Sequence, residues 1–421
     1  MTTPRPDHAL LAELLDLGDG DDESLLKLAL RHQFAPVLEA LCTEMLLDLP
    51  PLIGRDRLTI QYDIRMPQYV LGFTVEAGGA GARSEMLPWN PEGNPPGDEV
   101  DVHLRQSLPE FAALLRAVFG RRAAGDGHRV VSAALAAGCR RGDVDWPGLL
   151  ERTAARRRDL GGLALDFGTD KWGEHWYARN YQRHFEVLRD RPVRVLEIGV
   201  GGFHDPERGG ESLQMWKRFF PRAMVYGIDI ADKSALDSQR IKTFQGNQAD
   251  REFLESVVRE TGPLDIVLDD GSHFCADQIA TFQILARHVR PGGFYAIEDL
   301  HTSYWPGFGG SSTDLSSPAT TTGFLKSLVD GLNHEDLMPG TAYRRRETDR
   351  AIVGVHFFHS LAIMEMGLNA EGDLSSFIPD EVKRRGPQVL VPDYPVPEGF
   401  TADGPDERAE PAEPAAERVA D

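Results

Sequence analysis

Val193-Arg-Val-Leu-Glu-Ile-Gly199 is the first of four short apolar runs that decide the fold of this chain. The other three are Met224-Val-Tyr-Gly-Ile-Asp229, Leu264-Asp-Ile-Val-Leu-Asp-Asp270 and Phe294-Tyr-Ala-Ile-Glu298-Asp299. Helix-length amphipathic segments separate these runs. The pattern predicts an α/β fold with a mostly parallel sheet, because a strand covered on both faces need not alternate apolar and polar residues. Ligands bind at the carboxyl ends of such strands, so the polar residues that end the four runs define one expected pocket.

The composition is that of an ordinary globular protein, with 41% hydrophobic and 26% charged residues among 421. A formal charge of −21 argues against a nucleic-acid-binding surface, which needs basic residues. The three widely spaced cysteines indicate neither a disulfide framework nor a zinc site. Because the chain shows neither a signal peptide nor an apolar stretch of bilayer-spanning length, we expect a cytoplasmic protein without a membrane partner.

Residues 1–155 are predicted to form a separate N-terminal auxiliary α+β domain. Leucines at helical spacing indicate two or three amphipathic helices within residues 8–48. Residues 58–64 alternate like a half-buried strand and can pair with residues 70–76. The Gly- and Pro-rich residues 77–99 are expected to form a loop. The region carries no obvious chemical constellation, so we interpret it as an oligomerisation or substrate-covering domain of a homo-oligomer, dimeric or tetrameric.

The remaining boundaries follow from composition and spacing. Helices near 107–119 and 129–139 complete the N-terminal domain, and residues 156–400 form the larger domain. Residues 401–421 repeat Ala, Glu and Pro, which cannot bury a core, so we expect a disordered acidic tail. His356 and His359 lie on the apolar run 351–363, where a single strand would place them on opposite faces, so they are not expected to bind a metal as a pair.

The glycine motif at residues 195–202 allows the backbone to approach a ligand closely where a strand turns toward a helix. It departs from the dinucleotide fingerprint, because His204 stands where the third glycine belongs. Glu197 within the motif suits a ligand with a cationic amine. Asp229 ends the second strand and can accept both hydroxyls of a ribose; the alternative is a helix N-cap.

Two acidic groups end the third and fourth runs, Asp269-Asp270 before Gly-Ser-His273 and Glu298-Asp299 after Ile297. Buried carboxylates usually bind a cation or accept hydrogen bonds. Several oxygens without a cysteine favour a hard cation such as Mg²⁺ or Mn²⁺. His273 lies three residues beyond Asp270 and is a candidate general base; the alternative is a structural role.

Together these motifs resemble the S-adenosylmethionine-dependent O-methyltransferases that act on deoxysugars of macrolides and related antibiotics, in particular the mycinamicin and tylosin allose 2-O-methyltransferase group. The resemblance covers about residues 165–370. Besides the four runs, the matching segments are Glu211-Ser-Leu-Gln-Met-Trp-Lys217, Tyr304-Trp-Pro-Gly-Phe-Gly-Gly310, Leu325-Lys-Ser-Leu-Val-Asp330 and Ile352-Val-Gly-Val-His356.

The resemblance implies a class I (Rossmann-like) methyltransferase fold and a set of residues for each ligand. S-adenosylmethionine would be bound by Thr169, Glu197, Gly199, Gly201, Ser212, Asp229 and Gln248. Mg²⁺ would be held by Asp270, Glu298 and Asp299, with His273 as the base. Apart from the resemblance, Trp305 and Phe308 lie in a Gly-rich loop whose aromatic faces would cover the glycoside, and Tyr304 and Trp305 are the candidate substrate residues; simple packing is the alternative.

The expected reaction is therefore metal-dependent methyl transfer to a sugar hydroxyl, the 2-hydroxyl of a rhamnose- or allose-type deoxysugar, on a macrolide or other polyketide glycoside. A divalent cation would lower the pKa of the hydroxyl and fix its direction. Two alternatives stay open at this point. One is a metal-dependent glycosyltransferase, and the other is a non-catalytic assembly protein that retains a nucleotide-binding fold.

Overall fold

The structure is a computed structural model, and it describes residues 6–46, 57–78, 81–120, 159–335, 337 and 343–370. The predicted helix at 129–139, the domain boundary at residue 155 and the tail at 401–421 lie outside the described residues. No helix within these ranges is long and apolar enough to cross a membrane.

Three helices occupy the N-terminal region, as the leucine spacing predicted: α1 His8–Leu17, α2 Asp22–Arg31 and α3 Ala35–Leu46. The first two begin at aspartate caps, since Asp7 accepts a hydrogen bond from the Leu10 amide and Asp21 accepts one from the Ser24 amide. The periodic leucines of α1 are buried. Hydrophobic spacing and capping therefore agree on where these helices begin and which face they bury.

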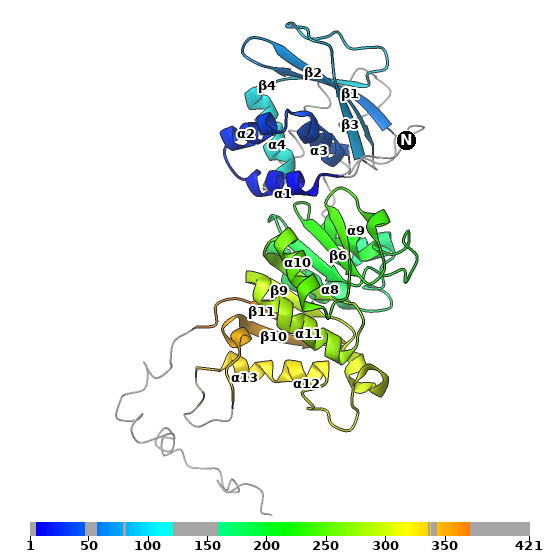
Figure 1. The fold of residues 1–421 in the computed structure, drawn as a ribbon, viewed down its shortest axis with the longest axis vertical. Coiled ribbons are helices and arrows are strands. Elements are labelled where there is room, and N and C mark those ends of the chain that lie inside the picture. Colours follow the sequence, from blue (N-terminus) through cyan, green and yellow to red (C-terminus); the bar gives the residue numbers. More distant parts are fainter. Residues whose placement is uncertain are drawn as a thin grey trace, which may run out of the picture. The chain divides into compact units, whose positions relative to one another are not determined.

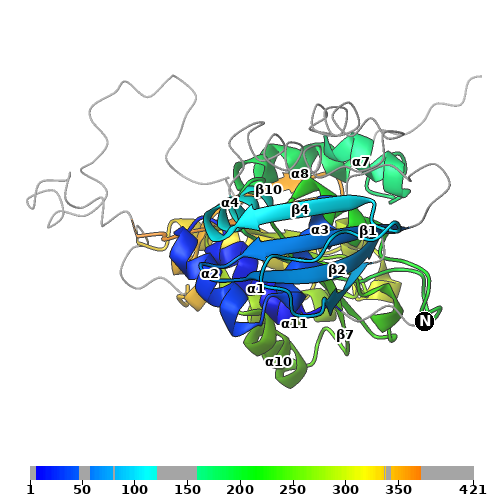
Figure 2. The same cartoon turned by 90° about the horizontal axis from the view of Figure 1, so that it is seen from above.

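A four-stranded sheet follows, in the order β3-β2-β1-β4. Its strands are β1 Arg57–Arg65, β2 Val70–Gly78, β3 Gly81–Met86 and β4 Val102–Ser107, and α4 Leu108–Phe119 follows β4. The predicted pairing of β1 with β2 is confirmed as antiparallel, and Figure 2 shows β2, β1 and β4 side by side. The loop prediction for residues 77–99 is wrong over β3, because that segment pairs with β2 as an edge strand despite its glycine content.

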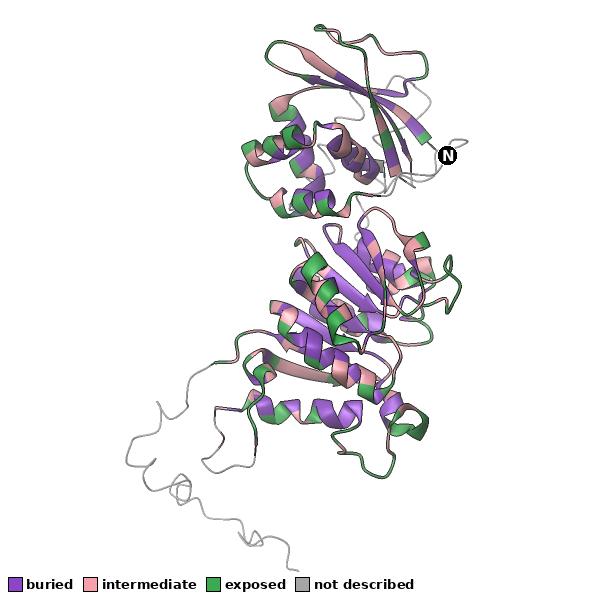
Figure 3. Cartoon of the chain, in the orientation of Figure 1, coloured by how far each residue is buried: buried purple, intermediate pink, exposed green. Residues whose placement is uncertain are grey.

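The larger sheet has seven strands in the order β10-β11-β9-β8-β5-β6-β7. Their bounds are β5 Arg194–Ile198, β6 Met224–Asp229, β7 Ile241–Gln245, β8 Leu264–Asp269, β9 Val289–Ile297, β10 Ile352–Phe358 and β11 Leu361–Met366. Strands β5 to β9 pair with one another in parallel, whereas β11 runs antiparallel to β9 and β10. The predicted mostly parallel α/β sheet is confirmed, and its inner strands are largely buried in Figure 3.

Helices cover both faces of this sheet (Figure 1). They are α7 Leu160–Phe167, α8 Tyr177–Phe185, α9 Glu211–Phe219, α10 Arg251–Thr261, α11 Cys275–Leu285, α12 Thr321–Lys326 and α13 Leu328–Leu332. Short 3₁₀ turns are η1 Glu186–Leu188, η2 Ser234–Leu236, η3 Ala286–His288, η4 Leu300–Tyr304, η5 Pro306–Phe308 and η6 Glu347–Arg350. Val195 packs in one core with α7, α8 and α9, and Leu196 packs in the other with α10, α11 and α12. Successive strand residues point to opposite faces, so each run contributes to both cores.

The apolar run 351–363 is not one strand, as the sequence suggested, but the hairpin β10–β11. Ser360 has a positive φ of 60° in the turn between the two strands. His359 consequently lies in the turn, and only His356 lies on a strand. Two residues at the turn reverse the chain, which apolar periodicity alone does not reveal.

Candidate active site

The parallel strands bring five carboxylates to one edge of the larger sheet. In the sheet, Ile198 of β5 lies opposite Asp269 of β8, which lies opposite Ile297 of β9. The residues near these strand ends therefore meet, and they are Glu197, Asp269, Asp270, Glu298 and Asp299. The predicted convergence of the run ends is confirmed for the first, third and fourth runs.

Lys171 lies at the centre of the deeper part of this cluster, although no motif in the sequence singled it out. Its Nζ lies 2.7 Å from Asp270 Oδ2, 2.9 Å from Glu298 Oε1 and 3.3 Å from Glu197 Oε1. The side chain is only 1% exposed. A buried cation with three carboxylate partners is consistent with the cost of leaving such charges unpaired. In the sequence, Lys171 ends the segment Gly168-Thr-Asp-Lys171, whose composition is equally typical of a plain turn.

Burial raises the pKa of each of these three carboxyl groups, although Lys171 opposes the shift. The pKa of Glu197 rises to about 7, and that of Glu298 rises well above its usual range. Burial acts to lower the pKa of Lys171, but the carboxylates around it raise that pKa well above its usual range. Lys171 thus stays protonated, whereas burial opposes ionisation of the carboxyl groups around it.

A second group, more open to solvent, is formed by Asp270, His273 and Asp299. Each of these residues can place one ligand atom within 4.8 Å of the other two. His273 Nε2 lies 3.5 Å from Asp299 Oδ2. His273 Nδ1 is buried and has no hydrogen-bond partner within the described part of the chain. The imidazole is therefore not committed to a structural hydrogen bond.

Two of the three residues of this open group have a strained backbone. His273 and Asp299 both have positive φ, 58° and 54° respectively. Residues other than glycine adopt this region at a cost, and such residues cluster at functional sites. The surroundings hold both in place: Tyr177 donates a 2.8 Å hydrogen bond to Asp299 Oδ1, and the Ser272 amide donates a 2.7 Å bond to Gln248 Oε1.

The three predicted metal ligands are divided between the two groups. Asp270 belongs to both, Asp299 belongs to the open group, and Glu298 belongs to the deeper group. Glu298 already accepts hydrogen bonds from Lys171 and, at 2.6 Å, from the Tyr181 hydroxyl. Asp270 likewise accepts a 2.7 Å bond from Lys171, and it links the deeper group to Asp299 and His273.

Gly199 is required by a close approach between two loops. Its φ is +90°, and a Cβ atom there would lie 2.0 Å from the carbonyl oxygen of Asp270. Gly201 also has a positive φ, of 79°. The glycine turn thus lets the end of β5 lie against the end of β8, which fixes the backbone next to the acidic cluster.

Asp229 caps the glycine turn. Its Oδ2 accepts a 3.0 Å hydrogen bond from the Val200 amide, and its Oδ1 accepts a 2.8 Å bond from the Ala231 amide. Each carboxylate oxygen retains a further lone pair. The side chain can accept two more hydrogen bonds, so the capping role does not exclude the predicted contact with a ribose.

The other side chains that were predicted to bind S-adenosylmethionine form hydrogen bonds within the protein. Glu197 Oε2 accepts bonds from Ser212 Oγ at 2.8 Å and Trp216 Nε1 at 3.1 Å. Gln248 Nε2 donates a 3.0 Å bond to Asp269 Oδ1. Thr169 Oγ1 accepts a 3.4 Å bond from the Lys171 amide. These side chains position the acidic cluster, and Lys171 supplies the cation that the sequence analysis expected from a ligand beside Glu197.

Tyr304 and Trp305 lie beyond the open group and are partly exposed, at 38% and 49%. The Trp305 ring lies 4.6 Å from the His301 ring and 6.0 Å from the Phe308 ring, which in turn lies 5.3 Å from Phe274. Phe274 directly follows His273, so this aromatic group lies beside the candidate base. A partly exposed aromatic surface at this place suits an apolar or sugar ligand.

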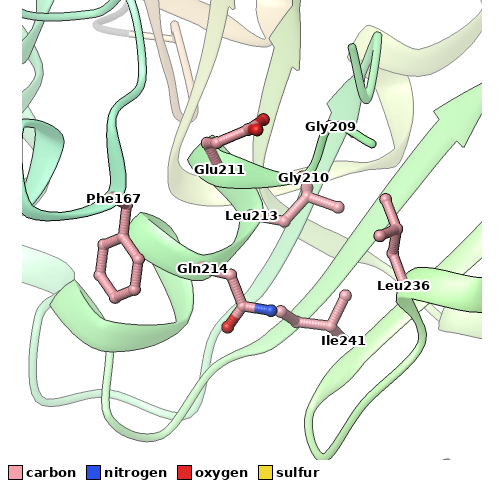
Figure 4. A pocket seen from close by; sticks show the side chains of 8 residues that line it. All are labelled: Phe167, Gly209, Gly210, Glu211, Leu213, Gln214, Leu236 and Ile241. Atoms are coloured by element: carbon pink, nitrogen blue, oxygen red, sulfur yellow. The ribbon is translucent and has the colours of Figure 1, made fainter. Parts of the chain in front are cut away.

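A separate pocket of about 160 Å³ lies at the start of α9 (Figure 4). It is lined by Phe167, Gly209, Gly210, Glu211, Leu213, Gln214, Leu236 and Ile241. None of the predicted site residues lines it. A Cβ atom on Gly209 would lie 2.5 Å from the Gly201 carbonyl oxygen. The pocket therefore adjoins the glycine turn that follows β5.

Comparison with known proteins gives close relatives, although no family model matches the chain. The chain is 48% identical over 232 residues to mycinamicin VI 2''-O-methyltransferase of Micromonospora griseorubida, which covers 55% of this chain and 58% of that relative. It is 34% identical over 396 residues to L-olivosyl-oleandolide 3-O-methyltransferase of Streptomyces antibioticus, covering 89% of this chain and 97% of the relative. The first match thus spans less than two thirds of its relative, whereas the second spans nearly all of it.

A solved structure agrees with these relatives. The MycE methyltransferase of the mycinamycin biosynthetic pathway, in complex with Mg, SAH and mycinamycin VI, superimposes with a TM-score of 0.67 at 36% identity. The alignment covers 90% of this chain and 98% of the MycE chain. The similarity therefore extends over both sheets and not only over the seven-stranded one.

Proposed function

Because the chain belongs to the sugar O-methyltransferase family that includes L-olivosyl-oleandolide 3-O-methyltransferase, we propose that it transfers the methyl group of S-adenosylmethionine to a deoxysugar hydroxyl on a polyketide glycoside. The observation that carries the proposal is the open group of Asp270, His273 and Asp299 at the carboxyl edge of the sheet. It combines two carboxylates with an uncommitted imidazole, the donors needed to bind a cation and to accept a proton.

The residues present fit a hard divalent cation such as Mg²⁺. Carboxylate oxygens are the ligands that Mg²⁺ prefers, and no cysteine contributes to the described cluster. Asp270 and Asp299 would contact the ion, and Glu298 would support it from the deeper group through the shared Asp270. When bound there, the cation would hold two adjacent sugar hydroxyls and lower the pKa of one of them. Crystals of MycE contain Mg together with SAH.

His273 would accept the proton of the hydroxyl that attacks the methyl group. Asp299, 3.5 Å from its Nε2, would stabilise the imidazolium that forms. Contacts of this length in a ligand-free site commonly tighten when substrate binds. Tyr177 would keep Asp299 in place through its 2.8 Å hydrogen bond.

The methyl donor would lie along the ends of β5 and β6. Gly199 and Gly201 would leave room for it, and Asp229 would accept the ribose hydroxyls with its remaining lone pairs. The part of the site that would bind the methionine end of the donor includes Thr169, Glu197, Ser212 and Gln248. These residues would act indirectly, through the hydrogen bonds that fix the acidic cluster.

For the acceptor we propose the 2-hydroxyl of a rhamnose- or allose-type deoxysugar. The relative of 48% identity acts on a 2''-hydroxyl, as its name states, and MycE was solved with mycinamycin VI bound. The exposed aromatic surface of Tyr304 and Trp305 would cover the glycoside. Stacking of a sugar or an apolar aglycone on such rings suits their partly exposed position.

The experiment is a panel of rhamnosyl and allosyl polyketides incubated with S-adenosylmethionine carrying a labelled methyl group. We expect label in the sugar of at least one acceptor, loss of turnover in excess chelator and recovery on adding Mg²⁺ or Mn²⁺. Calorimetry should show that the protein binds S-adenosylmethionine with and without chelator. Full turnover in strong chelator would contradict a role for the metal. If the protein bound a nucleotide sugar and did not bind S-adenosylmethionine, the function would be glycosyl transfer and not methyl transfer.

We also propose a domain division at residue 155, a dispensable tail at 401–421, a cytoplasmic location and a homo-oligomeric assembly. Light scattering on the eluting protein measures the mass of the assembly, and a monomer would contradict the last of these. Truncation at residue 400 should leave turnover unchanged.

A further inference from the structure

A second cluster of metal-ligand residues lies away from the acidic edge of the sheet, at the hairpin β10–β11. It consists of His184 of α8, His356 of β10 and Glu365 of β11. Each can place one ligand atom within 4.8 Å of the other two. The three residues come from three elements, so the fold and not a local motif brings them together.

His184 is held as a metal-binding histidine usually is. The residue is only 7% exposed, and its Nδ1 donates a 2.8 Å hydrogen bond to the Asn180 carbonyl oxygen. That bond fixes the tautomer, so Nε2 carries the free lone pair. Nε2 has no hydrogen-bond partner among the described residues. Phe294 and Phe358 pack against the ring at 6.0 and 5.8 Å, which fixes its direction.

His356 and Glu365 complete the cluster on the hairpin. His356 Nε2 lies 3.0 Å from Glu365 Oε1, and the His356 ring lies 4.7 Å from the His184 ring. Gly354 is paired with Glu365 in the hairpin. A Cβ atom at position 354 would lie 3.2 Å from His356 Nε2 and 3.4 Å from Glu365 Oε2. The glycine thus keeps the space beside both ligand atoms clear.

We propose that His184, His356 and Glu365 bind a first-row transition-metal ion of the Zn²⁺ class, with a fourth position open to water. Two imidazoles and one carboxylate favour such ions over Mg²⁺, which prefers oxygen ligands. Ligand atoms at roughly 2.0–2.2 Å from a tetrahedral ion lie about 3.4 Å from one another. The three ligand atoms lie within 4.8 Å of one another, and a bound ion would draw them to that spacing and take the place of the proton between His356 and Glu365.

The bound ion would join α8 to the hairpin. The Tyr177 hydroxyl of α8, which donates to Asp299, also lies 3.3 Å from the Ser360 carbonyl oxygen in the hairpin turn. Tyr181 of the same helix donates to Glu298. The ion would therefore reinforce a helix that supports the acidic cluster. This inference does not depend on the proposed methyl transfer.

The test is a Co²⁺ titration of the full, untagged chain in excess Mg²⁺, followed by visible absorption and calorimetry. Low-coordinate Co²⁺ bound through imidazole gives visible bands, and Mg²⁺ occupies oxygen-rich sites without giving any. We expect one Co²⁺ per chain and a rise in melting temperature. His356→Ala should weaken Co²⁺ binding by about tenfold or more, and Gly354→Ala should weaken it without removing a ligand.

The matched control is His288→Ala. His288 Nε2 lies 3.2 Å from Glu255 Oε2, a histidine–carboxylate pair for which the described residues offer no third ligand. This variant should bind Co²⁺ like the unaltered protein. Circular dichroism should show that all variants fold. Bands that persist unchanged in folded His356→Ala, or no Co²⁺ binding by the unaltered protein, would overturn the proposal.

Discussion

Lys171 connects the ends of three strands, because its ammonium contacts Asp270, Glu298 and Glu197 at once. The partners lie 99 and 127 residues away for Asp270 and Glu298. Without this cation, the buried carboxylates of Glu197 and Glu298 and the partly exposed one of Asp270 would face one another. The residue therefore stabilises the fold and also sets where each carboxylate of the candidate site points.

Replacing Lys171 with methionine should destabilise the protein by roughly 3–5 kcal/mol, the cost of removing one partner from a buried ion pair. The loss should be smaller at low pH, because the raised pKa values of the carboxyl groups then allow protonation to remove the repulsion. Urea unfolding at pH 6 and pH 8 measures this. Lys242→Met is the control, since that lysine pairs with Glu260 at the surface. If both variants lost the same free energy of unfolding, Lys171 would not be what stabilises the cluster.

His273→Ala should lower turnover by roughly two to four orders of magnitude, the usual contribution of a general base. Affinity for S-adenosylmethionine and dependence on Mg²⁺ should remain, because Asp270 and Asp299 are unchanged. Raising the pH should restore part of the rate, since hydroxide replaces the base. Labelled methyl transfer measures the rate and calorimetry measures donor affinity. His288→Ala should behave like the unaltered protein, and a near-normal rate for His273→Ala would assign His273 a structural role.

The glycine turn after β5 and the end of β8 form one unit, because Gly199 lies against the Asp270 carbonyl group. The hydrogen bond from the Asp270 amide to the Ile198 carbonyl oxygen, at 2.9 Å, holds the same contact. A change in the turn must therefore move the acidic residues as well. The donor and metal regions are coupled through the backbone and not only through their ligands.

Gly199→Ala should lower stability and also weaken both donor and metal binding. Alanine disfavours the φ of +90° at this position, and its Cβ atom would overlap the Asp270 carbonyl oxygen at 2.0 Å. Gly168→Ala is the matched control: its φ is +73°, but no atom lies within 4 Å of the added Cβ. Both variants should lose about 1 kcal/mol from backbone strain, and only Gly199→Ala should lose binding in calorimetry. Normal binding by Gly199→Ala would contradict the coupling.

The stability of the whole molecule should depend on Lys217, a residue of α9 that is only 6% exposed. Burial and the nearby Arg240 lower its pKa from 10.5 to about 8, although Glu44 opposes the shift. Between pH 8 and pH 10.5, Lys217 is mostly protonated in the unfolded chain and mostly neutral in the folded protein. Stability contributed by this group therefore rises as pH increases from about 8 to 10.5 and is lowest below pH 8.

Lys217→Met should consequently raise the free energy of unfolding at pH 7 by ~3 kcal/mol, the equivalent of the pKa shift. The gain should shrink toward zero as the pH approaches 10.5, the ordinary pKa of lysine. Urea unfolding of the variant and the unaltered protein across this range gives the difference directly. If the difference in free energy of unfolding between the two proteins did not vary with pH, the pKa of Lys217 would not be lowered in the folded protein.

The sequence alone determined the strands that carry the site and the residues at their ends. Four apolar runs, the glycine turn and the acidic pairs are local signals, and parallel pairing forces their carboxyl ends to one edge. The predicted α/β fold and the convergence of Glu197, Asp270 and Glu298 followed from that rule. The family resemblance rested on the same segments.

Only the tertiary structure decided what surrounds those residues. The partners of Lys171, the meeting of His184 with His356, the edge strand β3 and the hairpin in residues 351–363 depend on pairings between distant segments. No local periodicity records such pairings, because a turn residue or a lysine looks the same whatever it later contacts. Burial supplies the missing information: inside the core a charge must find a partner, and the fold determines which one it finds.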